Sequence, residues 1–161
     1  MTNTLTKHHH STLFYILLIL TIAWFGVMTW LSHQNGTDTG RTSKSLAQEI
    51  LRIFHIESDS LGDDGKLVRQ LNGGLRKAAH IVVFAILTVL VLSTLSAGGY
   101  GGTCRIVALI LLILWCWGDE ATKPFIVGRH FSWLDTSLNV LGVILGNALI
   151  SGVCFLLHLN G

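Results

Sequence analysis

Apolar residues in this chain gather into four long runs, and the segments between the runs are rich in charge, glycine or both. A helix needs roughly 20 apolar residues to cross the hydrocarbon core of a bilayer. The third run is the shortest of the four, yet it approaches this length. The pattern therefore predicts four membrane-spanning helices, at about residues 13–31, 78–95, 103–118 and 136–157.

The segment from Ser32 to Lys77, between the first two runs, is the longest polar stretch of the chain. Within it, apolar residues recur at helical spacing, with polar residues opposite, which predicts an amphipathic helix at the membrane interface. The apolar positions are Leu46, Ile50, Ile53 and Phe54. Residues 67–75 are predicted to form a second short helix that leads into the membrane. The Gly98–Gly102 run predicts a plain turn between spans.

Composition supports a single all-α domain, an integral membrane four-helix bundle that covers residues 1–161. Half of the residues are hydrophobic, 12% are charged, and the mean hydropathy is +0.58. The first run is long and no small-x-small cleavage site follows it before Ser32, so it is interpreted as a retained anchor. A net charge of +2 without a basic helix or an aromatic ladder gives no indication of nucleic-acid binding.

The junction between the third and fourth runs holds the most informative residues. It contains two adjacent acids, a Lys-Pro pair and a Gly-Arg-His turn, and Asp135 follows. With four spans, this junction shares one side of the membrane with the start of the second span. That side collects Arg76, Lys77, His80, Asp119, Glu120, Lys123, Arg129, His130 and Asp135. Charges near hydrocarbon are costly unless they pair, so the sequence predicts a polar pocket in which Lys77 or Arg129 pairs with the acids.

One face of the fourth span carries Asp135, Asn139, Gly142 and Gly146, spaced four, three and four residues apart. Each has a plainer interpretation beside the functional one. Asp135 fits a helix N-cap, Asn139 fits an interhelical hydrogen bond, and the two glycines fit close helix packing. Likewise, Asp119 and Glu120 could lie solvated at the interface, and His80 could be a packed core residue.

The ordered set resembles the VanZ-like family of small bacterial membrane proteins. The matching positions of its main block are Asp119, Glu120, Arg129, Asp135, Asn139, Gly142 and Gly146. Lys123 departs from the pattern, because many relatives have Gln there. A Lys-x-x-His block matches Lys77, His80 and then Phe84, and a Ser-x-Gln-x-Gly…Ser pattern matches Ser32, Gln34, Gly36 and Ser45.

The resemblance implies a multi-pass protein of the bacterial cytoplasmic membrane. The founding member of the family is linked to resistance against teicoplanin-type lipoglycopeptides. The expected function is therefore a cell-envelope factor whose pocket binds a lipid-linked ligand or a lipoglycopeptide. Arg129 and Lys77 would hold an anionic head group, and the second and fourth spans would hold the acyl portion.

Two other classes of function remain open. A membrane-embedded enzyme acting on an envelope lipid could use Asp119, Glu120, Asp135 and His80 as acids and bases, although no nucleophile motif accompanies them. A small transporter or assembly subunit would need a homo-oligomer, which Gly142 and Gly146 would permit. The sequence leans against an enzyme but does not decide it.

No cofactor is expected, and the ligand spacing matches no known metal motif. The acids could bind a divalent cation, but no other feature of the sequence supports one. The expected partners are the bilayer, the lipid-linked ligand and a second copy of the chain. The side of the membrane that bears the charges stays undetermined. The positive-inside rule places it in the cytoplasm, whereas the link to cell-wall antibiotics places it outside.

Overall fold

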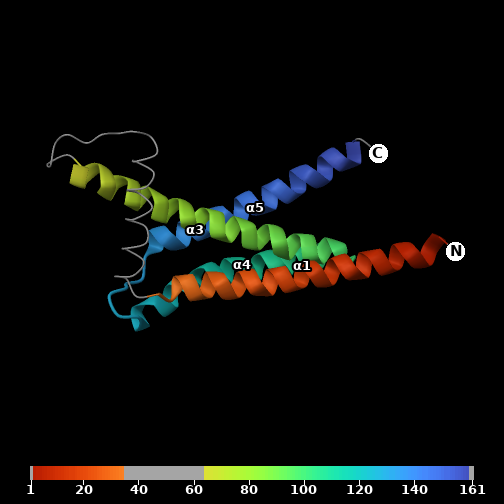
Figure 1. The fold of residues 1–161 in the computed structure, drawn as a ribbon, viewed down its shortest axis with the longest axis horizontal. Helices are drawn as coiled ribbons and strands as arrows, with labels where there is room; N and C mark the ends of the chain where they lie inside the picture. The colour runs from red at the N-terminus through yellow and green to blue at the C-terminus, as the bar shows by residue number, and fades with distance from the viewer. Residues whose placement is uncertain (1, 35–63, 160–161) are drawn as a thin grey trace.

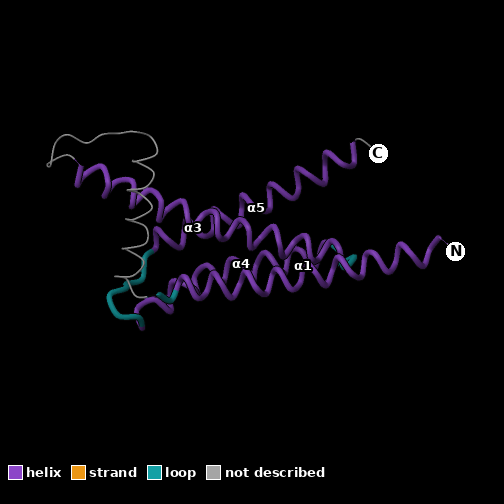
Figure 2. Tube along the Cα trace, viewed as in Figure 1, coloured by secondary structure: helices purple, strands orange, loops and turns teal. Residues whose placement is uncertain are grey.

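In the computed structural model the chain forms a bundle of long helices (Figure 1). Backbone is described for residues 2–34 and 64–159, and side chains for residues 12–34 and 70–156. The helices are α1 (Thr2–Ser32), α3 (Asp64–Ala97), α4 (Gly102–Thr122) and α5 (Trp133–Leu159), with a short 3₁₀ helix, η1 (Lys123–Phe125), directly after α4. Figure 2 shows helices and loops as the only elements of these described residues, which confirms the all-α prediction.

The four helices are long and apolar enough to cross a membrane, over Thr12–Ser32, Gln70–Ala97, Gly102–Phe125 and Trp133–Leu156. Their outward side chains are apolar and largely exposed, for example Ile19 (65%), Leu111 (60%) and Leu149 (61%). Exposed apolar surface on this scale suits lipid rather than water. The chain is a multi-pass membrane protein.

Helix α3 is the centre of the bundle. It packs against α5 and α1, and α4 packs against α5 and α3. A tryptophan joins α1 to α3, since Trp24 Nε1 donates to the Val83 carbonyl oxygen at 3.1 Å. The apolar core consists of Met28, Phe84, Leu87, Leu112, Cys116 and Val143.

Gly142 and Gly146 bring the backbones of α3 and α5 together. A Cβ on Gly146 would lie 2.6 Å from the Ala85 carbonyl oxygen, and one on Gly142 would meet the Ile81 carbonyl oxygen. Only glycine permits this approach, as in other small-residue helix contacts of membrane proteins. At this contact no acyl chain fits between α3 and α5, and the expectation that the second and fourth spans hold the acyl portion stays a prediction.

Helix α3 is longer than predicted. It begins at Asp64, so residues 67–75 are the first turns of the second spanning helix and not a separate short helix. No proline interrupts the sequence from Asp64 to Ala97, and a helix once nucleated extends as long as each residue can adopt it. The amphipathic helix predicted over Leu46–Phe54 lies outside the described residues.

The turn between α3 and α4 is a Schellman motif. Tyr100 N–H donates to Leu95 O at 3.0 Å, and Gly99 N–H donates to Ser96 O at 3.1 Å. Gly99 has a φ of +72°, the left-handed conformation that this motif requires at the residue after the cap. The glycine run is therefore the plain turn that the sequence predicts.

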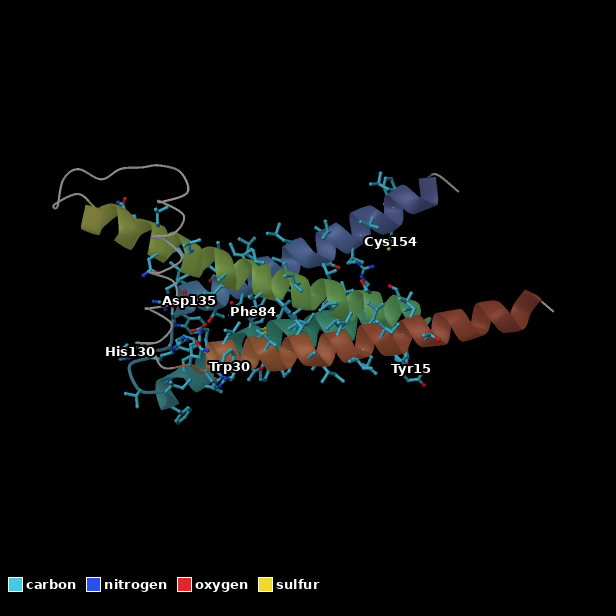
Figure 3. The ribbon with its side chains drawn as sticks, in the orientation of Figure 1. Tyr15, Trp30, Phe84, His130, Asp135 and Cys154 are labelled. Atoms are coloured by element: carbon cyan, nitrogen blue, oxygen red, sulfur yellow. The ribbon has the colours of Figure 1, made fainter. Side chains whose placement is uncertain are left out.

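The two ends of the bundle differ in chemistry. Both chain termini lie at one end, together with Tyr15 and Cys154, and Trp30, His130 and Asp135 lie at the other (Figures 1 and 3). An even number of spans produces this arrangement. The polar residues of the α4–α5 junction thus gather at the end away from the termini.

Candidate functional site

The junction after α4 is shaped by Pro124 and Gly128. Pro124 has no N–H to continue an α-helix, and α4 ends at Thr122 before the 3₁₀ turn of η1. Arg129 N–H then donates to Ile126 O at 3.1 Å across a turn whose third residue, Gly128, has a φ of +76°. The polypeptide reverses here and returns into the membrane as α5.

Three ionisable side chains at this junction are buried together: Asp119, Glu120 and Lys123 are 2%, 0% and 3% exposed. Lys123 Nζ contacts Glu120 Oε1 and lies 3.8 Å from Asp119 Oδ2. Ser32 of α1 donates a hydrogen bond of 2.8 Å to the same Asp119 oxygen. We call Asp119, Glu120 and Lys123 the buried triad. Because one cation neighbours two anions, each of these buried charges has a partner of opposite sign.

The buried triad departs from two of the expectations from the sequence. The two acids are enclosed, so the alternative that they lie solvated at the interface is wrong. Lys123, the residue that departs from the pattern of the resemblance, pairs with both acids, and Lys77 lies exposed on α3. Arg129, the other cation that the sequence predicts, lies near enough to the same acids for them to raise its pKa. One helical turn separates Lys123 from both acids, since the spacings are three and four residues.

His80 joins α3 to α5. Its Nδ1 lies 2.9 Å from Asn139 Oδ1, and its Nε2 lies 3.7 Å from Asp135 Oδ2. Asn139 is fully buried, whereas His80 and Asp135 keep 20% and 24% of their side-chain surface. The hydrogen bond fixes the imidazole ring and turns Nε2 toward the acid.

Asp135 is not the N-cap of α5. The helix begins at Trp133, and Ser132 caps it by accepting a hydrogen bond of 3.2 Å from the Asp135 N–H on its Oγ. Asp135 occupies the third helical position. There its carboxylate interacts favourably with the positive end of the helix dipole and faces His80.

A cavity of about 210 Å³ opens between α1 and α3 beside these residues. One part of its wall is charged or polar and the other is apolar. The lining residues are Met28, Leu31, Ser32, Gln34, Arg76, Ala79, His80, Val83, Phe84, Asp119 and Arg129. We call it the charged cavity. Of the predicted pocket residues, His80, Asp119 and Arg129 line it, Glu120, Asp135 and Asn139 lie behind or beside His80, and Lys77 is absent from the lining.

Arg76 takes the place that the sequence suggested for Lys77. Burial lowers the pKa of Arg129, and the neighbouring charge of Arg76 lowers it further, while Glu120, Asp119 and Asp135 raise it. Arg76 and Arg129 thus place two positive charges on the wall of one cavity, and acids near Arg129 offset part of their mutual repulsion.

Sequence reasoning missed a second polar contact at the other end of the bundle. Arg105 of α4 donates to Asn147 Oδ1 at 2.8 Å and to Ser151 Oγ at 2.6 Å on α5. The four-residue spacing of Asn147 and Ser151 placed them on one helical face, but nothing in the sequence indicated which helix this face meets.

The fold and the site together define a helical multi-pass membrane protein with a cluster of buried charges at one end. The family model VanZ/LLP1 matches residues 13–157, so the chain belongs to the VanZ-like family. No curated protein and no solved structure matches the chain.

Proposed function

We propose that the protein is a cell-envelope factor of the bacterial cytoplasmic membrane that binds the anionic group of a lipid-linked ligand or a lipoglycopeptide in the charged cavity. Binding would change how such ligands meet the envelope. Membership of the VanZ-like family supports this class of function, because the founding member is linked to teicoplanin-type resistance.

The observation that carries the proposal is the pair of guanidinium groups in one cavity. Arg76 and Arg129 both line the charged cavity, on a helix and on a loop that meet there. Two cations held close together repel, and a phosphate or carboxylate between them removes that repulsion. Planar guanidinium groups bind such anions with two parallel hydrogen bonds.

The opposite wall of the cavity suits a ligand that is part lipid. Met28, Val83 and Phe84 are apolar and line the same space. One helical turn further along α1, Phe25 lines an apolar groove of about 460 Å³ between α1, α3 and α4. This groove, rather than the packed contact of α3 with α5, has room for an acyl portion.

The test is protection of a susceptible Gram-positive host against teicoplanin, with vancomycin as the comparison drug that lacks the lipid tail. Host cells would express the wild-type chain, Arg76→Ala, Arg129→Ala or Lys77→Ala at matched membrane levels. We expect protection that is selective for teicoplanin, is lost in Arg76→Ala and Arg129→Ala, and is retained in Lys77→Ala.

Direct binding completes the test. Wild-type protein in nanodiscs should bind a lipid-linked anionic ligand about 10–100-fold more tightly than either arginine variant, since a hydrogen bond to a charged group contributes about 1.5–3 kcal/mol. Equal drug susceptibility of all strains, together with equal binding by all variants, would contradict the proposal.

A second candidate is a membrane-embedded enzyme acting on an envelope lipid. The observation in its favour is that His80 and Asp119 line the same cavity as the arginine pair, with Asp135 directly beside His80. An enzyme would leave a changed lipid or glycan in expressing cells, detectable by mass spectrometry and absent from a His80→Gln strain. A pure binding factor would leave the envelope lipids unchanged.

A further inference from the structure

Three residues from three different helices bring potential metal ligands together. His80 of α3, Glu120 of α4 and Asp135 of α5 each offer one ligand atom, and these atoms all lie within 4.8 Å of one another. His80 also lines the charged cavity, and Glu120 and Asp135 raise the pKa of Arg129, but neither arginine offers a ligand atom to this group. We call them the His–acid group.

The hydrogen bond of His80 determines which ring nitrogen is available. Asn139 presents its amide oxygen, which can only accept, so the Nδ1 of His80 carries the proton and donates it. In the neutral ring, Nε2 then has a free lone pair, and it points to the Asp135 carboxylate at 3.7 Å. Two electron-rich atoms face each other at a distance too long for a hydrogen bond and suited to a cation between them.

Glu120 supplies the second, independent indication. Its side chain is fully buried, and its Oε2 has no hydrogen-bond partner, while its Oε1 contacts Lys123. A buried carboxylate oxygen without a partner is rare, because leaving it unpaired costs roughly 1–3 kcal/mol or more for a charged group. A cation at the His–acid group, to which Glu120 offers one ligand atom, would lie beside this carboxylate.

We propose that His80 Nε2, Glu120 and Asp135 bind a divalent transition-metal ion such as Zn²⁺. One imidazole and two carboxylates form a ligand set typical of Zn²⁺ and Mn²⁺. Two ligands at about 2.0–2.2 Å from a tetrahedral ion lie roughly 3.4 Å apart, close to the His80–Asp135 separation. Asn139 would act as the outer partner that fixes the tautomer of the ligating histidine, a role that amide and carbonyl oxygens have in other metal sites.

An ion can reach the site and remain there. His80 lines the charged cavity, which opens beside the site. The charges of the two carboxylates would balance those of a divalent ion, while Lys123 continues to pair with Asp119 and with the other oxygen of Glu120. The proposal does not depend on the proposed function, because it concerns a cation and not the anionic ligand.

The experiment is a Zn²⁺ titration of the full chain, purified in detergent through a tag without histidine. His8, His9 and His10 are replaced by alanine in every sample, so that this tract does not contribute. Calorimetry and elemental analysis after dialysis should find one Zn²⁺ per chain. His80→Gln, Glu120→Gln and Asp135→Asn should each weaken binding at least about 100-fold, and Asn139→Ala about 10–100-fold.

A matched control separates the site from general charge. His130→Ala removes an exposed histidine that is outside the His–acid group, and it should not weaken binding more than about threefold. Thermal unfolding in detergent verifies that each variant is folded. If Glu120→Gln does not fold, the variants at His80 and Asp135, which are 20% and 24% exposed, still decide the question. Zn²⁺ binding that is absent from the wild-type chain, or unchanged in the His80 and Asp135 variants, would overturn the proposal.

Discussion

Lys123 contacts Glu120, three residues before it in the chain, at a place where neither side chain reaches solvent. The same ammonium group lies 3.8 Å from Asp119. The stability of the junction after α4 should therefore depend on this cation. Lys123→Met is expected to lower the free energy of unfolding by about 3–5 kcal/mol, because it removes the cation that contacts Glu120 and lies beside Asp119, both of which are buried.

Thermal unfolding in detergent measures this effect, and Lys77→Met is the control. Lys77 is exposed, so its loss should change stability by no more than about 0.5 kcal/mol. Adding Glu120→Gln to Lys123→Met should restore part of the lost stability. Similar stability of the two lysine variants would show that the buried triad does not stabilise the fold.

The packing of α3 against α5 gives a second prediction. Gly146→Ala should destabilise the bundle by about 1–3 kcal/mol, because the added methyl group would lie 2.6 Å from the Ala85 carbonyl oxygen. Gly152→Ala, on the same helix with nothing within 4 Å, should be neutral or stabilising by up to about 1 kcal/mol. The free energy of unfolding of both variants is measured in the same detergent. A loss of stability in Gly146→Ala alone indicates a steric clash, whereas an equal loss in both indicates a general effect of replacing glycine in α5.

The turn before α5 gives a third prediction. Gly128 and Gly99 both have positive φ, at +76° and +72°, but only Gly128 precedes a residue of the charged cavity. Alanine at either position should lower stability by about 1–2 kcal/mol. Gly128→Ala should also weaken binding of the anionic ligand, since it displaces Arg129. An equal loss of binding in Gly99→Ala would indicate that the effect is global.

The opposite end of the bundle gives a fourth prediction. Arg105→Ala removes the contacts with Asn147 and Ser151 and should lower stability by about 1 kcal/mol. Protection against teicoplanin should remain, because these residues do not line the charged cavity. Comparison with Arg129→Ala at matched expression separates a role in stability from a role at the site.

Much of the fold could be predicted from the sequence, because long apolar runs have few structural options in a membrane. The gathering of His80, Asp119 and Arg129 at one end also followed from the number of spans alone. The pairing of charges did not follow. The choice between Arg76 and Lys77 depends on the rotation of α3, and adjacent residues on a helix point about 100° apart.

Two contacts of the site could have been predicted from residue spacing in the sequence. The spacing of Glu120 and Lys123 is that of a helical ion pair, and Ser132 stands three residues before Asp135, the spacing of a capping box. The contact of His80 with Asn139 had no such signal, since residues 59 positions apart meet only through the packing of α3 on α5.

Both chain termini lie at the end of the bundle away from Asp135 and His130 (Figures 1 and 3). A compartment-sensitive reporter fused to either terminus therefore reports the side of the membrane opposite to the charged cavity. An N-terminal and a C-terminal fusion must agree with each other, so each serves as an internal check on the other. A single pair of fusions thus assigns the cavity to the cytoplasm or to the exterior, which the distribution of lysine and arginine could not do.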